Sequence, residues 1–190
     1  MHAIDLLTNR NTASNLQDPA PSGTNLEAIF QAGLRSPDHA RLRPWRFLTI
    51  DGDARLELGQ LFASSLKHRN PNCNDSDLIK VRKQPLRAPL IIVVMAKLVS
   101  HPKVPETEQM LSAGCACHAM LLAAESLGFA GIWRTGVNAY DANVKKGLGL
   151  AEHESIIGYL YLGTRKAMPK PLPSMESSDF FQTWPQKLIP

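Results

Sequence analysis

A short polar stretch beginning at Arg35 holds most of the side chains in this sequence that could bind an anion. Residues 35–47 read Arg-Ser-Pro-Asp-His-Ala-Arg-Leu-Arg-Pro-Trp-Arg-Phe, with four arginines, a histidine and a tryptophan. Pro37 and Pro44 fix their own φ angles and disfavour helical geometry in the residues before them. The sequence therefore predicts a stiff, exposed loop. Such a loop could present cations to an anionic ligand, or it could be a solvated turn whose arginines face water.

Two further groups of donors stand beside predicted elements. After a helix predicted over residues 3–9, Arg10, Asn11 and Thr12 place a guanidinium, an amide and a hydroxyl within three residues, which suits phosphate oxygens. After an apolar run, residues 133–135 (Trp-Arg-Thr) place an aromatic wall beside two donors, which suits one edge of a flat heterocycle. Each group has a structural alternative: a solvated turn for the first, and a core position for the tryptophan.

The chain carries no familiar constellation for nucleophilic or metal catalysis. It has no Gly-x-Ser-x-Gly elbow, no His-Glu-x-x-His, no Rossmann Gly-x-Gly-x-x-Gly and no phosphate loop, and its six histidines are scattered. The three cysteines, Cys73, Cys115 and Cys117, indicate neither a disulfide framework nor a metal site. An enzyme without such residues must take its reactive group from a bound cofactor. A flavin fits, because it needs from the protein mainly phosphate anchors and donors near its ring.

Length and composition limit the classes of protein to which this chain can belong. The chain has 190 residues, of which 44% are hydrophobic, and this suits a single globular domain over residues 1–190. The N-terminus is too short and too charged for a signal peptide, and the apolar run at residues 88–96 is too short to cross a bilayer. We therefore expect a cytoplasmic protein with no membrane association. The net charge of +4 favours anionic partners without identifying them.

The predicted elements place the donor groups at the ends of helices and strands. Thr24 and Glu27 have the form of a capping box for a helix that must end before Pro37, and this helix would aim the loop that follows. The apolar run over residues 88–98 lacks alternation, which is typical of a strand buried on both faces. The other predicted strands are residues 46–51, 129–133 and 155–162, and the other predicted helices are residues 53–62, 106–127 and 141–148.

Three segments have less regular patterns. The helix over residues 106–127 is small or apolar almost all round and calls for burial, so His118 within it is expected to be a hydrogen-bonded core histidine. Residues 67–87 are polar, with a cluster of Lys and Arg, and are expected to be the least ordered part of the chain. From residue 168 onward the prolines predict an extended tail that lies on its own subunit or on a partner.

Five short motifs together resemble the nitroreductase family of flavin enzymes, and in particular its short YdjA-like NAD(P)H nitroreductases. Residues 36–47, Ser-Pro-Asp-His-x-x-Leu-x-Pro-Trp-Arg-Phe, are similar to the second motif of the family. The other four motifs follow the family's order and extend the likeness over nearly the whole chain: Asn9–Ser14, Ser112–Cys115, Gly131–Gly136 and Gly158–Gly163. The resemblance implies a nitroreductase-like α+β fold with a central, mostly antiparallel mixed sheet, flanking helices and an extended C-terminal tail.

The resemblance also implies roles for residues. FMN would be held by Arg10, Asn11, Thr12, Arg35, His39, Trp133, Arg134 and Thr135. Asn11 departs from the family, which usually has a second arginine there, so a further anchor such as Arg165 or Lys166 is expected. FMN is favoured over FAD, because no dinucleotide fold is present to house an adenylate. NADH or NADPH would approach the end of the long helix, at Ala123, Ala124, Glu125, Ser126, Leu127 and Gly128. Residues 67–87 would form a mobile cover over the substrate side of the flavin.

These features predict an FMN-dependent oxidoreductase that takes a hydride from NADH or NADPH and reduces nitroaromatics, quinones or similar small electron-poor acceptors. The resemblance implies a homodimer with FMN at its interface, residues 10–12 and 133–135 of one chain facing Arg35 and His39 of the other. One alternative is a flavin-binding storage or sensor protein without turnover. Another is a nucleic-acid-binding domain, which the aromatic content of only 6% disfavours, with a surface made of Arg35, Arg41, Arg43, Arg46 and Trp45.

Overall fold

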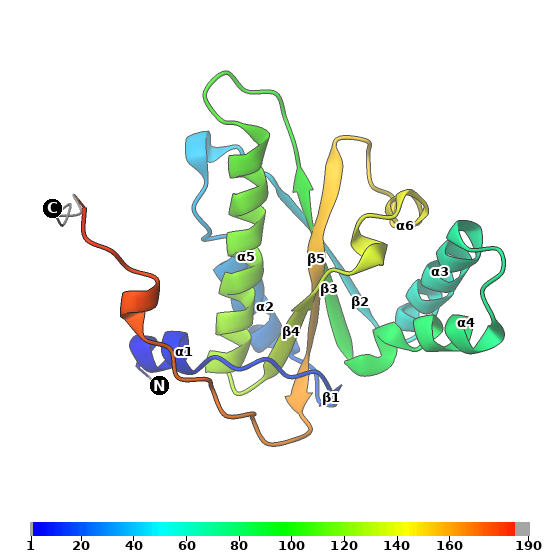
Figure 1. The fold of residues 1–190 in the computed structure, drawn as a ribbon, viewed down its shortest axis with the longest axis horizontal. Coiled ribbons are helices and arrows are strands. Elements are labelled where there is room, and N and C mark those ends of the chain that lie inside the picture. The colour runs from blue at the N-terminus through cyan, green and yellow to red at the C-terminus, as the bar shows by residue number, and fades with distance from the viewer. Residues whose placement is uncertain (1, 185–190) are drawn as a thin grey trace, which may run out of the picture.

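The computed structural model describes residues 2–184, which form a five-stranded sheet with helices on both faces (Figure 1). The strands are β1 (Leu16–Gln17), β2 (Trp45–Asp51), β3 (Leu90–Lys97), β4 (Ala130–Arg134) and β5 (Glu154–Arg165). The α-helices are α1 (Ala3–Asn9), α2 (Gly23–Gly33), α3 (Ala54–Arg69), α4 (Asp75–Arg82), α5 (Glu106–Ser126) and α6 (Ala142–Gly147). Single 3-10 turns occur at η1 (His39–Arg41), η2 (Gln84–Arg87), η3 (Val137–Ala139) and η4 (Ser177–Asp179).

Every strand pair in residues 2–184 is antiparallel. β3 lies between β2 and β5, and its residues 90–96 are all buried, as the unbroken apolar run predicts. β4 and β1 share the other side of β5, where β4 pairs with residues 159–163 and β1 with residues 164–165. The predicted α+β class with a mostly antiparallel sheet is confirmed.

The two faces of the sheet bury alternate residues of β3, because side chains along a strand point to opposite faces. Leu90, Ile92 and Val94 belong to a core shared with α2 and α5. Ile91 and Val93 belong to a second core shared with α3 and α6. Figure 1 shows the two helix layers, with α2 and α5 on one face and α3, α4 and α6 on the other.

One extra residue in β5 changes which of its side chains face each helix layer. The β3–β5 register shifts between Val94 and Met95, and Ile157 is the residue without a partner on β3. A bulge of this kind shifts the alternation of side chains by one position. Ile156 and Tyr159 therefore both face the α3 side, although an uninterrupted strand would put them on opposite faces.

The predicted capping box at the start of α2 is wrong. The helix begins at Gly23, one residue before Thr24, with Ser22 as its N-cap and no capping hydrogen bond from that side chain. Glu27 instead accepts a hydrogen bond from the side chain of Gln31, at 2.7 Å. A positive φ of 53° at Gly23, which glycine adopts without strain, lets the chain enter the helix earlier than the hydroxyl pattern suggests.

Most of residues 67–87 lie in α3, α4 and η2, so the expectation that this is the least ordered part of the chain is wrong, while its role as a mobile cover stays a prediction. α3 continues to Arg69, and Asn74 caps α4 by accepting a hydrogen bond from the N–H of Asp77, at 2.9 Å. Gly59 on α3 allows close contact with α4, because a Cβ at this position would lie 2.3 Å from the carbonyl oxygen of Arg82. The polar composition reflects a helix without buried residues and does not indicate disorder.

The tail after β5 is extended apart from η4, as predicted for the part up to residue 184. In Figure 1 it runs past the end of α5 and close to α1. Phe180, Phe181 and Trp184 are more than two-thirds exposed. The remainder of the predicted tail, residues 185–190, lies outside the described residues. None of the helices in residues 2–184 is long and apolar enough to cross a membrane.

Candidate functional site

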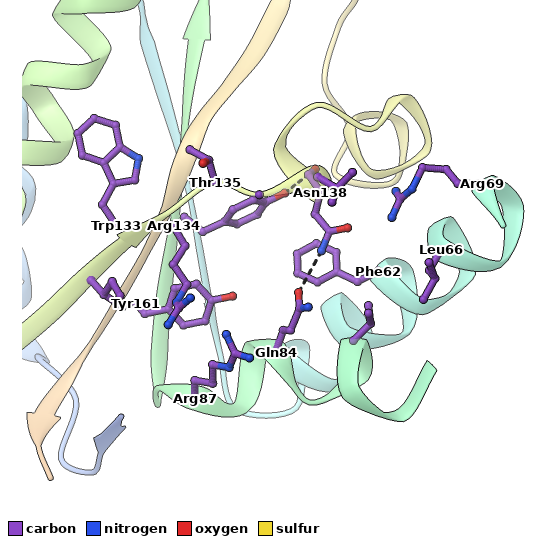
Figure 2. Close-up of a pocket in the computed structure, with 15 residues that line it drawn as sticks. Phe62, Leu66, Arg69, Gln84, Arg87, Trp133, Arg134, Thr135, Asn138 and Tyr161 are labelled. Carbon is purple, nitrogen blue, oxygen red and sulfur yellow. Dashed lines mark hydrogen bonds between the residues drawn. The ribbon is translucent and has the colours of Figure 1, made fainter. Parts of the chain in front are cut away.

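A cavity of about 510 Å³ lies where the end of β4 meets α3, η2 and β5 (Figure 2). This volume is within the usual range for small-molecule sites, roughly 300–1,000 Å³. The lining residues are Phe62, Leu66, Arg69, Val81, Gln84, Arg87, Ile132, Trp133, Arg134, Thr135, Gly136, Val137, Asn138, Tyr159 and Tyr161. Four of these fifteen side chains are aromatic and three are cationic.

The cavity is positively charged. It is lined by three arginines and, in the described part of the chain, by no acidic residue. Only Arg69 has an ion-pair partner, Asp141, while Arg87 and Arg134 have none within residues 2–184. The Nε of Arg134 is buried without a hydrogen-bond partner there. A buried donor without a partner costs free energy, so this atom indicates a place for a group that the chain does not itself supply.

Tyr161 lies close to both unpaired arginines (Figure 2). Burial raises the pKa of Tyr161, and the positive charges of Arg87 and Arg134 oppose this rise. The hydroxyl therefore stays protonated at neutral pH and is available as a donor. The cavity thus offers two guanidinium groups and a phenol in one place.

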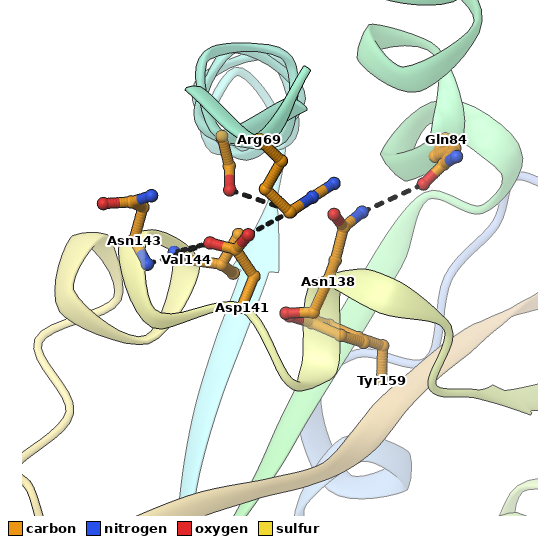
Figure 3. A network of polar contacts seen from close by, with 8 residues as sticks. Arg69, Gln84, Asn138, Asp141, Asn143, Val144 and Tyr159 are labelled. Atoms are coloured by element: carbon orange, nitrogen blue, oxygen red, sulfur yellow. Dashed lines mark hydrogen bonds and ion pairs between the residues drawn. The ribbon is translucent and has the colours of Figure 1, made fainter. Parts of the chain in front are cut away.

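A polar network holds the opposite wall of the cavity (Figure 3). Arg69 donates a hydrogen bond to the hydroxyl of Ser65, at 3.0 Å, and forms an ion pair with Asp141. The same carboxylate accepts hydrogen bonds from the N–H groups of Asn143 and Val144, at 2.8 and 3.0 Å, and so caps the N-terminus of α6. Desolvation alone would raise the pKa of Asp141, but its contacts with Ser65, Arg69 and the cap lower it to about 2.

Asn138 extends this network toward the sheet. Its side-chain amide donates a hydrogen bond to Oε1 of Gln84, at 3.2 Å. Its backbone carbonyl accepts a hydrogen bond from the hydroxyl of Tyr159, at 3.1 Å. Burial raises the pKa of Tyr159, which keeps that hydroxyl a donor. The ring of Tyr159 meets Phe62 edge-on, with centroids 5.6 Å apart. Contacts to α3, η2 and β5 therefore fix this wall from three directions.

Trp133 separates the cavity from a groove on the α5 side of β4. Its indole N–H donates to the carbonyl of Ile157 at 3.2 Å, and 38% of the residue is exposed. Gly158 is required beneath it, because a Cβ there would lie 2.0 Å from the indole nitrogen. The groove, of about 690 Å³, is lined by Ala32, Arg35, Ser36, Pro37, Leu111, Gly114, Cys115, His118, Ala119, Leu122 and Trp133.

α5 is buried on one side only. Ala113, Cys117 and Met120 are packed on the sheet, whereas Leu111 is 64% exposed and lines the groove. His118 is also exposed in the groove, so the prediction of a core histidine is wrong. A helix that is apolar all round is expected to be buried all round. Here one apolar side is left uncovered within a single chain.

The donor group at residues 10–12 lies beside β4, at the C-terminal end of α5 (Figure 1). The N–H of Ala13 donates to the carbonyl of Gly131 at 3.1 Å, which holds the segment against the sheet. Arg10 contacts the hydroxyl of Thr12 at 3.4 Å. The structure therefore brings the guanidinium and hydroxyl groups together, as phosphate binding requires.

Arg165, one of the two further anchors that the sequence suggested, lies in the same place. It donates to the carbonyl of Asn11 at 3.0 Å and approaches Glu125 at 3.4 Å. The side-chain amide of Asn11 donates to the carbonyl of Lys170 at 2.6 Å, so this residue supports the tail. Lys166 lies in an adjoining depression whose lining is Asn15, Leu16, Lys83, Leu86, Arg87 and Lys166.

His39 lies at the opposite end of α5. Its Nδ1 is 2.7 Å from Oε2 of Glu108, in the first turn of the helix. Glu108 and Glu125 are 17 positions apart, which at about 1.5 Å per residue separates them by about 25 Å. Within one chain the structure does not bring His39 together with the group at residues 10–12. Arg35 lies between these ends, in the groove that Trp133 also lines.

The loop that carries these residues is fixed by Asp38, whose carboxylate accepts the N–H groups of Leu42 and Arg43 at 3.1 and 2.8 Å. Arg46 has 35% of its side chain exposed, and its guanidinium forms an ion pair with Glu154 at 2.7 Å, which lowers the pKa of that carboxylate to about 2. Trp45 packs against the α2–α5 core. Arg35, Arg41, Arg43 and Trp45 line one hollow of about 410 Å³, so the structure brings together four of the five residues of the alternative nucleic-acid-binding surface.

The candidate nicotinamide residues 123–128 form the C-terminal turn of α5. Ala124 is fully buried and offers no surface to a ligand. The hydroxyl of Ser126 donates to the carbonyl of Ala123 at 2.8 Å, and Gly128 ends the helix with a φ of 83°. These contacts explain Ala124, Ser126 and Gly128 by structure alone. The role of residues 123–128 toward NADH or NADPH stays a prediction.

Several lining residues of the cavity were not found from the sequence. They are Arg69, Gln84, Arg87, Asn138, Tyr159 and Tyr161. The Lys and Arg cluster near residue 87 was visible as a charge pattern, but nothing local connected it with β4. The tyrosines were visible as strand residues. Their position in the cavity wall depends on the bulge at Ile157 and on the pairing of β4 with β5.

Known proteins resemble this chain over most of its length. The sequence matches the model of the Nitroreductase family over residues 7–164. It is 45% identical over 170 residues to the "Putative NAD(P)H nitroreductase YdjA" of Escherichia coli K12, with 86% of this chain and 88% of that protein covered. The "Putative NAD(P)H nitroreductase" of Haemophilus influenzae is 34% identical over 165 residues, with 86% of this chain and 89% of that protein covered.

Solved structures share the fold at lower identity. A nitroreductase-like family protein from Bacillus cereus superposes with a TM-score of 0.83 and 18% identity, covering 98% of this chain and 97% of that one. A nitroreductase from Bacteroides fragilis, solved with bound FMN, gives a TM-score of 0.73 and 21% identity, covering 96% and 100%. The family match and the two sequence relatives agree over most of the chain. The chain belongs to the nitroreductase family.

Proposed function

We propose that this protein is an FMN-dependent oxidoreductase that takes a hydride from NADH or NADPH and reduces small electron-poor acceptors such as nitroaromatics and quinones. The observation that carries the proposal is the cavity at β4, where the buried Nε of Arg134 has no hydrogen-bond partner within residues 2–184. The family match and the printed names of the sequence relatives support the same reaction class.

The residues around the cavity fit FMN, which combines a flat ring with a phosphate. Trp133, Tyr159 and Tyr161 give the cavity aromatic walls, and Arg134 and Thr135 give it donors. A second set of donors for the phosphate, made of residues 10–12 and Arg165, borders the same strand. When bound, FMN supplies the redox chemistry by accepting a hydride and passing its two electrons to an acceptor.

Each group of the chain has a distinct task in this proposal. Arg10, Thr12 and Arg165 bind the phosphate by charge-assisted hydrogen bonds. Trp133 excludes water from one edge of the cavity, and its position is fixed by the hydrogen bond to Ile157. The network around Asp141 keeps the far wall in one geometry, which preorganises the site before substrates enter.

We further propose a homodimer in which each site draws on both chains. The exposed apolar side of α5 supports a large isologous interface, since Leu111 is 64% exposed. The separation of about 25 Å along α5 gives a second reason, because His39 cannot serve the phosphate site of its own chain. A twofold axis across the middle of α5 would bring the His39 end of one chain to the Arg10 end of the other.

The test of the cofactor and the reaction is spectroscopic. Purified protein is expected to be yellow, to release FMN and not FAD on heating, and to lose its flavin absorbance when NADH or NADPH is added anaerobically. Adding a nitroaromatic or a quinone should restore the absorbance. Protein that neither carries nor takes up FMN would contradict the proposal. Protein that binds FMN without bleaching would favour the storage or sensor alternative.

The shared site is tested by complementation. Chains carrying only Arg10→Ala and chains carrying only His39→Ala should each retain flavin poorly. Mixed as a heterodimer, they should recover one intact site in two, because one interface position then has both native residues. A flavin-loaded, active monomer in sedimentation would contradict the dimer. A verified heterodimer without recovery would contradict only the sharing of the site.

A further inference from the structure

We propose that His118 lies in the contact between two copies of this chain, and that the copies associate more tightly when its imidazole is neutral. The dimer then weakens as the pH falls below about 6.5, the ordinary range for histidine protonation. This inference rests on the proposed homodimer, because it names the residue through which pH regulates that assembly and the sites shared across it.

The exposed side of α5 has the pattern of a helix that packs against another helix. Leu111, Cys115, His118 and Leu122 line the groove and follow one another at spacings of four, three and four residues. These spacings keep the four side chains on one side of the helix, as in helix–helix contacts. Gly114 lies in the same lining and has no side chain to keep a second helix away. A second copy of this stripe fits the surface.

The ends of α5 indicate that the second copy runs in the opposite direction. The helix has the proposed phosphate site at one end and His39 at the other, and an antiparallel partner brings these ends together. A twofold axis across residue 116, the midpoint of Glu106–Ser126, places Gly114 of the partner subunit opposite His118. The imidazole is then enclosed near the centre of the contact.

The groove offers no negative charge to a protonated imidazole at position 118. It is lined by residues of α5, of β4, of α2 and of the loop after α2, and the other ionisable side chains among them are Arg35 and Cys115. No carboxylate lines it in the described part of the chain. Association places two copies of Arg35 and His118 in a largely apolar contact. A proton on His118 adds a like charge without a partner and therefore opposes association.

The carboxylates at the ends of α5 are distant and already paired. Glu125 is seven positions from His118, or about 10 Å at 1.5 Å per residue, and forms an ion pair of its own. Glu108 of the partner subunit lies six positions from Gly114, or about 9 Å along the helix, and is also paired. In the loop after α2, the carboxylate of Asp38 accepts two backbone N–H groups. None of the three acids neutralises a charge at the centre of the contact.

The direction and size of the effect follow from proton linkage. An imidazole in water gains its proton at about pH 6.5, whereas enclosure without an acidic partner favours the neutral form. The dimer is therefore at full strength above this pH and weakens as the pH falls through it. At pH 5.5, one unit lower, each histidine disfavours association about tenfold, and the two histidines of a dimer do so about a hundredfold.

The test measures the dissociation constant of the dimer at pH 8 and at pH 5.5, by sedimentation velocity on diluted, fluorescently labelled protein. The wild-type constant is expected to rise by roughly a hundredfold at the lower pH. His118→Gln keeps a polar side chain that cannot gain a proton, and should reduce the rise to roughly threefold or less. His68→Gln, which removes an exposed histidine of α3 outside the groove lining, should leave the rise unchanged.

His118→Lys fixes a positive charge at this position and should weaken the dimer at pH 8 as acid weakens the wild-type dimer. A wild-type dissociation constant in His118→Lys would overturn the proposal, and so would an equal rise at pH 5.5 in the wild-type protein and in His118→Gln. A wild-type dimer that does not respond to pH would overturn this proposal and leave the homodimer standing. A wild-type monomer at micromolar concentration and pH 8 would overturn both.

Discussion

The cavity and the groove lie on opposite sides of Trp133 and differ in the character of their walls. The cavity has aromatic and cationic walls, and hydrogen bonds from α3, η2 and β5 hold one of them in place. The groove is lined mainly by apolar and small residues, with Arg35 and His118 also in its lining. A rigid, charged hollow suits a small anionic ligand, whereas an open apolar surface suits another protein. One strand thus borders two hollows with different linings.

The largest effect is expected on the groove side. Leu111→Glu places a charge at the most exposed apolar position of α5. Because a twofold interface contains this position once from each chain, the substitution would weaken the dimer by about 3–6 kcal/mol. Sedimentation velocity should then show a monomer at micromolar concentration. Leu56→Glu is the matched control, since Leu56 on α3 is 55% exposed and lies outside both hollows. If Leu111→Glu stays dimeric, the groove is not the interface.

The next effect is expected on the polar wall of the cavity. Asp141→Ala leaves Arg69 without its partner and removes the cap of α6, so the free energy of unfolding should fall by about 3–5 kcal/mol. Urea denaturation measures this loss. Asp77→Ala, which breaks an exposed pair with Lys80, should cost less than about 1 kcal/mol. Equal losses in the two variants would show that the wall is no more tightly held than the surface.

A third prediction separates the phosphate site from other basic loops. Arg10→Ala should weaken flavin retention more than Arg41→Ala, by about 1.5–3 kcal/mol in binding free energy, because Arg41 is an exposed loop residue. Flavin occupancy after dialysis, or fluorescence titration of the apoprotein, measures the difference. Equal losses in both variants would show that the phosphate is bound elsewhere.

The last effect is a response to acid. The pKa values of Asp141 and Glu154 are lowered to about 2 in the fold, so the unfolded chain binds protons before the folded chain does as pH falls. Stability should therefore be full above about pH 4.5 and decline toward pH 2, by about 2 kcal/mol for each carboxylate. Asp141→Asn should remove roughly half of this decline. A decline that is unchanged in the variant would contradict the assignment.

The fold was predictable because its signals are local. The unbroken apolar run of β3, the glycine after α5 and the proline-rich tail each report the geometry of their own segment. The capping box failed because a hydroxyl and a carboxylate at the right spacing do not fix a helix start when Gly23 offers an earlier one. Local patterns therefore place elements well and helix starts less well.

The candidate site was predictable only in part, because its two halves depend on different information. Residues 10–12 and 133–135 have distinctive types and neighbouring positions along the chain, so sequence reasoning found them. The remaining lining comes from α3, η2 and β5, and only tertiary packing joins these to β4. His118 shows the same limit on the other side, since an apolar helix does not reveal which of its sides the chain itself will cover.

Ile157, which has no pairing partner on β3, affects how the sequence of this chain can change in evolution. Because the side-chain alternation of β5 differs before and after that residue, deleting it would turn one half of the strand over relative to the other. If pairing with β4 and β1 held the later half, Ile156 would leave its core and Glu154 would turn away from Arg46, with every remaining residue type unchanged. A change of length at this position is therefore a larger mutation than most substitutions. Relatives with a shorter β5 should differ in which side chains meet the sheet's helix layers, even where their residue types agree.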